Sequence, residues 1–150
     1  MIERAARNVT LTSGKILQGV IWFKIIFTFV LIALLCLVPA EGYKRLGMPV
    51  VPSSLFFVRL LGAAYIALVV GYIQAVYNLK AGKSAVEAVC VGIVSNGLAF
   101  IILLCYWVNG AWTNYQHPAR IGFWTFTGAV GAITAGLIWA GLIKGGAKGV

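Results

Sequence analysis

The chain has 150 residues, of which 61% are hydrophobic and 10% are charged, and its mean hydropathy is +0.97. A soluble domain of this size must cover its core with polar side chains, so this composition excludes a water-soluble globular protein. The net charge is +9, but the basic residues are dispersed at the ends of apolar segments, which excludes a nucleic-acid-binding surface. We expect membrane lipids, including anionic lipids, to balance this charge.

Four apolar segments follow one another along the chain: Val20–Val38, Leu55–Leu79, Val86–Val108 and Ile121–Ile143. A helix of about 20 apolar residues crosses the hydrocarbon core of a bilayer, and each segment is about that long. None alternates apolar and polar residues as the strands of a membrane barrel do. The sequence predicts an all-α integral membrane four-helix bundle, with one domain over residues 20–150 and an interfacial arm or helix over residues 1–19.

Turn-forming residues separate the segments. Pro39 closes the first, and the connection to the second is rich in Gly and Pro. Gly82 is predicted to end the second helix, and Ser84 with Glu87 to form a capping box for the third. Pro118 falls in the first turn of the fourth helix, where proline is favoured.

The basic residues near the segment ends are unevenly distributed. Eight lie in the N-terminal segment, the second connection and the C-terminal tail, and four lie on the opposite side. Because basic residues are enriched on the cytoplasmic side, this bias predicts that both termini are cytoplasmic. We expect the chain in the cytoplasmic (inner) membrane of a bacterium.

Small residues recur at every fourth position in two of the segments. Such stripes let helix backbones approach closely in lipid. They predict helix packing, either of one stripe against the other within the chain or of a stripe against its copy in a homo-oligomer. The positions are Ala63, Ala67, Gly71 and Ala75 in the second segment, and Gly128, Ala132, Gly136 and Ala140 in the fourth.

Polar residues inside the segments are the candidates for function. Asn96 lies near the middle of the third segment and needs a partner, because an unpaired amide in lipid costs several kcal/mol. It is expected either to make an interhelical hydrogen bond or to form a ligand-binding cavity with Gln74, whose helical face Arg59 shares. Arg59 is expected to reach the interface, to pair with Glu41, or to attract an anionic ligand.

Lys24 lies inside the first segment, and we expect it to extend to the inner interface or to pair with Glu87. Cys36 and Cys105 fall at similar depth, so a disulfide is conceivable, although buried free thiols are expected for all three cysteines. A lone histidine does not predict a metal or haem site. No cofactor is predicted, and a bound lipid or quinone is compatible with the sequence.

One stretch is similar to a known family. The connection with Pro49 and Pro52, followed by Val58-Arg59-Leu60-Leu61-Gly62-Ala63, resembles DoxX-like four-helix membrane proteins. That family is functionally diverse and includes subunits associated with quinone-linked redox complexes. The resemblance therefore implies a helical bundle and a partner, and it transfers no catalytic residue.

Three functions remain open at this point. The first is a non-catalytic subunit, or an assembly or stabilising factor, of a larger membrane complex. The second is a small transporter or channel for a neutral or anionic solute, and the third is a quinone-linked redox component. The three glutamates lie in a tail, a loop and a helix cap, so no carboxylate is left within the spans for proton transfer. This favours the first function and argues against an enzyme.

Overall fold

The computed structural model describes residues 2–45, 47–48, 52–145 and 147, and these contain no strand. Pro49 of the first connection and Lys148, one of the basic residues of the C-terminal tail, lie outside the described residues. The helices are α1 (Ile2–Leu37), α2 (Ala40–Arg45), α3 (Pro52–Lys80), α4 (Val86–Val108), η1 (Ala111–Asn114) and α5 (His117–Gly136). A π-helical segment, η2 (Leu137–Ile143), continues α5 without a break.

Four of these helices are long and apolar enough to cross a membrane, which confirms the predicted membrane-embedded helical protein. The spans are Ser13–Leu37, Ser54–Lys80, Val86–Val108 and His117–Ile143. The second and third agree closely with the apolar segments. The first and fourth begin earlier than predicted, because a helix that bonds its own backbone can include polar residues at its ends. Residues of the expected N-terminal arm are therefore continuous with the first span.

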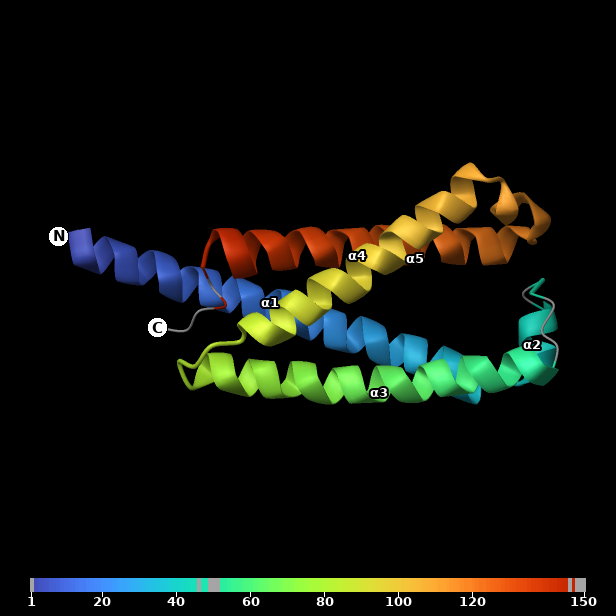
Figure 1. The fold of residues 1–150 in the computed structure, drawn as a ribbon, viewed down its shortest axis with the longest axis horizontal. Coiled ribbons are helices and arrows are strands. Elements are labelled where there is room, and N and C mark those ends of the chain that lie inside the picture. Colours follow the sequence, from blue (N-terminus) through green and yellow to red (C-terminus); the bar gives the residue numbers. More distant parts are fainter. Residues whose placement is uncertain (1, 46, 49–51, 146, 148–150) are drawn as a thin grey trace.

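The helices form two antiparallel pairs, α1 with α3 and α4 with α5 (Figure 1). They alternate in direction, so the two ends of the chain lie at the same end of the molecule, which we call the terminal end. There η2 packs against both α1 and α4 and joins the two pairs. Towards the opposite end, which carries α2 and η1 and is called the loop end, the pairs diverge (Figure 1).

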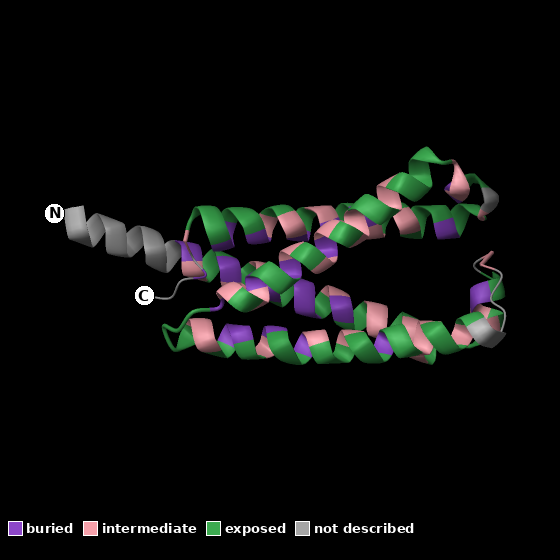
Figure 2. Cartoon of the chain, in the orientation of Figure 1, coloured by how far each residue is buried: buried purple, intermediate pink, exposed green. Residues whose placement is uncertain are grey.

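Burial follows this arrangement, and most buried positions lie towards the terminal end (Figure 2). Among the described residues, the last buried position of α1 is Thr28 and that of α4 is Asn96. Both helices continue beyond these positions, to Leu37 and Val108, with exposed or half-buried side chains. Most of the buried core therefore lies in the terminal-end half of the spans, although Tyr43, Trp112 and Ala119 are buried at the loop end.

Glycines bring η2 close to its neighbours at the terminal end. A Cβ placed on Gly141 would lie 2.8 Å from Cγ1 of Val89 on α4 and 3.5 Å from Cδ1 of Leu17 on α1. A Cβ on Gly92 of α4 would lie 2.7 Å from Cδ1 of Leu137. There is no room for a side chain at Gly141 or Gly92. Side chains of α1 and α4 therefore pack directly on the backbone of η2, and a side chain of η2 packs on the backbone of α4.

The turn between α3 and α4 differs from the prediction. Gly82 has φ +69°, which is the expected left-handed end of a helix. The capping box is not formed, because Ala85 is the N-cap residue and no side chain caps the helix. The Ser84 hydroxyl instead donates to the carbonyl of Ala147 (3.2 Å), which also accepts the N–H of Ala85 (2.8 Å). The carbonyl of Ala147 therefore holds this turn in place.

Candidate functional site

A cation is buried inside the membrane-spanning region. Lys24 of α1 is 4% exposed, and its ammonium nitrogen lies 4.6 Å from the centroid of the Tyr72 ring of α3. The expectation that Lys24 extends to the interface is therefore wrong. Its ammonium group contacts the face of an aromatic ring instead. A cation over an aromatic ring gains about 0.5–2 kcal/mol, which offsets part of the large cost of placing a charge at this depth.

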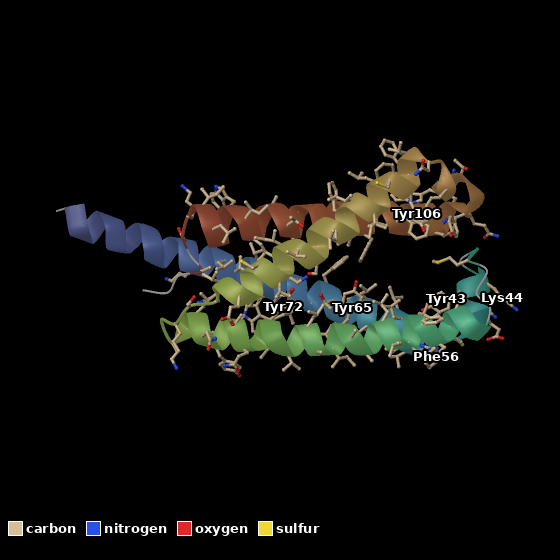
Figure 3. All side chains as sticks on the ribbon, viewed as in Figure 1. Tyr43, Lys44, Phe56, Tyr65, Tyr72 and Tyr106 are labelled. Carbon is tan, nitrogen blue, oxygen red and sulfur yellow. The ribbon has the colours of Figure 1, made fainter. Side chains whose placement is uncertain are left out.

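The hydroxyl of Tyr72 is the second unusual group. Tyr72 is 2% exposed, and of the buried side-chain polar atoms that the structure describes, its hydroxyl oxygen is the one without a hydrogen-bond partner. It points to α4, where a Cβ on Gly92 would lie 3.4 Å away and where Ser95 is its polar neighbour. Figure 3 shows Tyr72 projecting from α3 between the helix pairs. A buried unsatisfied hydroxyl costs about 1–3 kcal/mol.

Several other polar side chains in the spans bond to the backbone of their own helix. The amide nitrogen of Asn96 donates to the carbonyl of Gly92, so the expected interhelical bond is replaced by a bond within α4. Ser95 donates to the same carbonyl at 3.3 Å. Thr28, Thr127 and Thr134 each donate to the carbonyl four residues earlier. These groups are satisfied locally, which is how hydroxyls are accommodated in membrane helices.

A groove of about 420 Å³ lies between α3 and α4. Gln74 lines it and is exposed, and its amide donates to Oδ1 of Asn78 at 3.3 Å. Asn96 is not among the lining residues. The groove is lined by Ala67, Leu68, Gly71, Tyr72, Gln74, Ala75 and Asn78 of α3, and by Ser84, Ala85, Val86, Glu87, Ala88 and Val91 of the turn and α4.

Arg59 lies far from Gln74 along α3. It precedes Gln74 by fifteen positions on α3, which is about 22 Å of helix. Its guanidinium donates two hydrogen bonds of 2.8 Å, to the carbonyls of Leu35 and Val38 at the end of α1. The last carbonyls of a helix lack intrahelical partners, so Arg59 caps α1, in place of the expected partners Glu41 or an anionic ligand.

Tyr43 of α2 completes this cap, because its hydroxyl donates to the carbonyl of Leu34 at 2.7 Å. Burial raises the pKa of Tyr43, and the nearby Arg59 guanidinium opposes that rise. The phenol therefore stays protonated at neutral pH and remains a donor. The structure does not bring Arg59, Gln74 and Asn96 together, and a cavity built from all three is not present in the described residues.

Some positions of the two small-residue stripes contact another helix, and others are exposed. Ala75 and Ala140 are buried, and a Cβ on Gly136 would lie 3.2 Å from Val20 of α1. The other five positions are exposed, and each stripe's helix packs mainly on a different partner, α1 for α3 and α4 for α5. The exposed positions are Ala63, Ala67, Gly71, Gly128 and Ala132.

Cys36, Cys90 and Cys105 are all free, but Cys90 and Cys105 are exposed on their helix, against the expectation of burial. Within the described part of the chain, no three His, Cys, Asp or Glu side chains gather as a metal site would require. Comparison of the chain with protein-family models, with curated proteins and with solved structures finds no match. The DoxX-like resemblance therefore stays a prediction.

The pairing of Lys24 with Tyr72 was not predicted. A signal for the burial of Lys24 exists in α1, where Leu17, Ile21 and Thr28 share its helical face at spacings of three, four and seven residues. A lysine on an otherwise buried stripe must itself be buried. Which residue of another helix it meets depends on helix pairing, for which the sequence carries no local signal.

Proposed function

We propose that this chain is a non-catalytic integral membrane protein that acts as a subunit, or as an assembly or stabilising factor, of a larger complex in the bacterial cytoplasmic membrane. The observation that carries the proposal is that the buried faces of α1 and α4 end well before the helices do. Among the described residues the buried faces of α1 and α4 stop at Thr28 and Asn96, although both helices run on towards the loop end.

The loop-end half of the spans is suited to receive other helices. Phe27 of α1 stacks on Phe126 of α5 with their ring centroids 5.6 Å apart, and Leu34, two turns further along the same face of α1, is 47% exposed. Exposed small residues in the loop-end halves of α3 and α5, Ala63 and Gly128, allow close approach of a further helix backbone. A partner inserted here would extend the core along the whole length of the spans.

The polar groups of the spans support a structural role. Arg59 and Tyr43 cap α1, and Asn96 and the three threonines bond within their own helices. Four spans of alternating direction, together with the excess of basic residues on one side, support a topology with both termini in the cytoplasm.

Site-specific photo-crosslinking in intact membranes tests the proposal. A photoreactive residue is placed at Leu34, inside the diverging loop end, or at Tyr77, which is 64% exposed near the terminal end. We expect Leu34 to cross-link to one unrelated membrane protein, which also co-purifies in fixed ratio in mild detergent, and Tyr77 to cross-link to lipid. Recovery of lipid alone, or of the same chain alone, from Leu34 would contradict the proposal.

A further inference from the structure

Along the groove between α3 and α4, an apolar end, hydrogen-bond donors and a carboxylate follow one another. This order matches the acyl chain, the phosphate and the ammonium group of a zwitterionic phospholipid. We propose that the groove binds a phospholipid with a zwitterionic headgroup that ends in an ammonium group, such as an ethanolamine lipid. The acyl chain lies along Ala67 and Gly71, and the ammonium group lies at Glu87. This inference is independent of the proposed subunit function.

The apolar end of the groove lies deeper in the span. It is formed by Ala67, Leu68 and Gly71 of α3 and by Val91 of α4. Gly71 and Ala67 are exposed, and a Cβ on Gly71 would meet no atom within 4 Å, so the surface there is open. From Ala67 to Asn78 the helix rises about 16 Å, which is enough for most of an acyl chain and the glycerol region.

The middle of the groove offers hydrogen-bond donors. Gln74 and Asn78 both line it, and because Oδ1 of Asn78 accepts from Gln74, the Asn78 amide nitrogen remains to donate to an oxygen of the ligand. Tyr72 also lines the groove, and its ring separates the groove from the buried ammonium of Lys24. A positive charge behind this wall favours a negatively charged group at that level.

The outer end of the groove carries the opposite charge. Of the described residues that line it, Glu87 is the one with a negative charge, and it lies in the first turn of α4 at the membrane interface. Donors followed by a carboxylate match a phosphate followed by an ammonium group. The headgroup of an anionic lipid that ends in hydroxyl groups has no positive charge to pair with the Glu87 carboxylate, so such a lipid should bind less well.

The walls of the groove favour a lipid over a water-soluble solute. About 420 Å³ falls in the range of small-molecule sites, and eight of the thirteen lining residues are Ala, Gly, Val or Leu. Because the helices face lipid along their exposed sides, the groove is reached from within the bilayer. Its ligand is therefore a component of the membrane.

Native mass spectrometry of the full chain tests this proposal. The protein is purified in mild detergent and offered equal amounts of phosphatidylethanolamine and phosphatidylglycerol with identical acyl chains. We expect the ethanolamine lipid to be retained about fivefold more often, which corresponds to about 1 kcal/mol of selectivity. Glu87→Gln should abolish that preference while leaving total lipid binding similar. Equal retention, a preference for the glycerol lipid, or an unchanged preference in Glu87→Gln would overturn the proposal.

A second variant tests the location of the acyl chain. Gly71→Leu fills the apolar end of the groove and meets no atom of its own fold at Cβ, so the protein should remain folded. Gly128→Leu is the matched control, because Gly128 is also exposed on a span with open space around it but lies outside the groove. Lipid retention should fall in Gly71→Leu alone. Equal retention in the two variants, with both eluting as folded protein, would show that the lipid binds elsewhere.

Discussion

The ammonium nitrogen of Lys24 lies 4.6 Å from the centroid of the Tyr72 ring, so a buried cation on the first span is held by an aromatic face on the second. Tyr72 also lies against α4, where Gly92 leaves space for its hydroxyl. One side chain therefore joins the two helix pairs at the terminal end. The stability of this region should depend on the ring of Tyr72 more than on its hydroxyl.

Replacing Tyr72 by Phe or by Leu separates these two contributions. Tyr72→Phe keeps the ring and removes an unpartnered hydroxyl, so we expect the free energy of unfolding to stay the same or to rise by up to about 1 kcal/mol. Tyr72→Leu loses the cation–π contact and leaves a void, so the free energy of unfolding should fall by about 2–4 kcal/mol. Denaturant unfolding in detergent micelles measures both. Equal losses in the two variants would mean that the hydroxyl is bonded.

Removing the charge of Lys24 should be tolerated. Lys24→Met keeps most of the side-chain volume and eliminates the desolvation of a cation, so we expect a stability equal to or above that of the wild type. Lys15→Met, an exposed position on the same helix, serves as the control and should change little. A loss of more than about 1 kcal/mol in Lys24→Met alone would contradict this expectation and would mean that the contacts of the ammonium outweigh its desolvation.

The cap on α1 should respond to the shape of the Arg59 side chain. Arg59→Lys keeps the charge but cannot reproduce two parallel 2.8 Å bonds to Leu35 and Val38, so a loss of about 1–2 kcal/mol is expected. Tyr43→Phe should lose about 1 kcal/mol. Because both groups cap the same helix end, their effects in a double mutant should not be additive. Additive losses, or a loss of similar size in the exposed control Arg45→Lys, would argue against a shared cap.

Two glycines in the spans should react in opposite ways to the same substitution. Gly141→Ala places a methyl group 2.8 Å from Cγ1 of Val89, a stiff buried side chain, and should lower stability by about 1–3 kcal/mol. Gly71→Ala meets no atom within 4 Å and should be neutral or stabilising by up to about 1 kcal/mol. Thermal unfolding of the two variants side by side measures the difference. Similar behaviour would mean that η2 and α4 are not in close contact.

The sequence by itself determined the helical class, the number of spans and most of their ends. These properties are local: hydropathy over a window of residues reports transfer into lipid, and prolines and glycines act on their own backbone. Gly82, for example, takes the left-handed conformation that its position between two spans predicts. These predictions use only the local sequence and require no information about residues that lie nearby in space.

Only the tertiary structure decided which faces of the helices meet. The stripe containing Gly71 and the close contact at Gly141 look alike in sequence, yet one is open and the other has no room for a methyl group. Arg59 bonds to carbonyls more than twenty residues earlier, and Lys24 meets a tyrosine on another helix. In lipid, apolar residues gain nothing by choosing one apolar neighbour over another, so helix pairing depends on shape and on a few polar contacts between distant segments. Those contacts exist only once the helices are placed side by side.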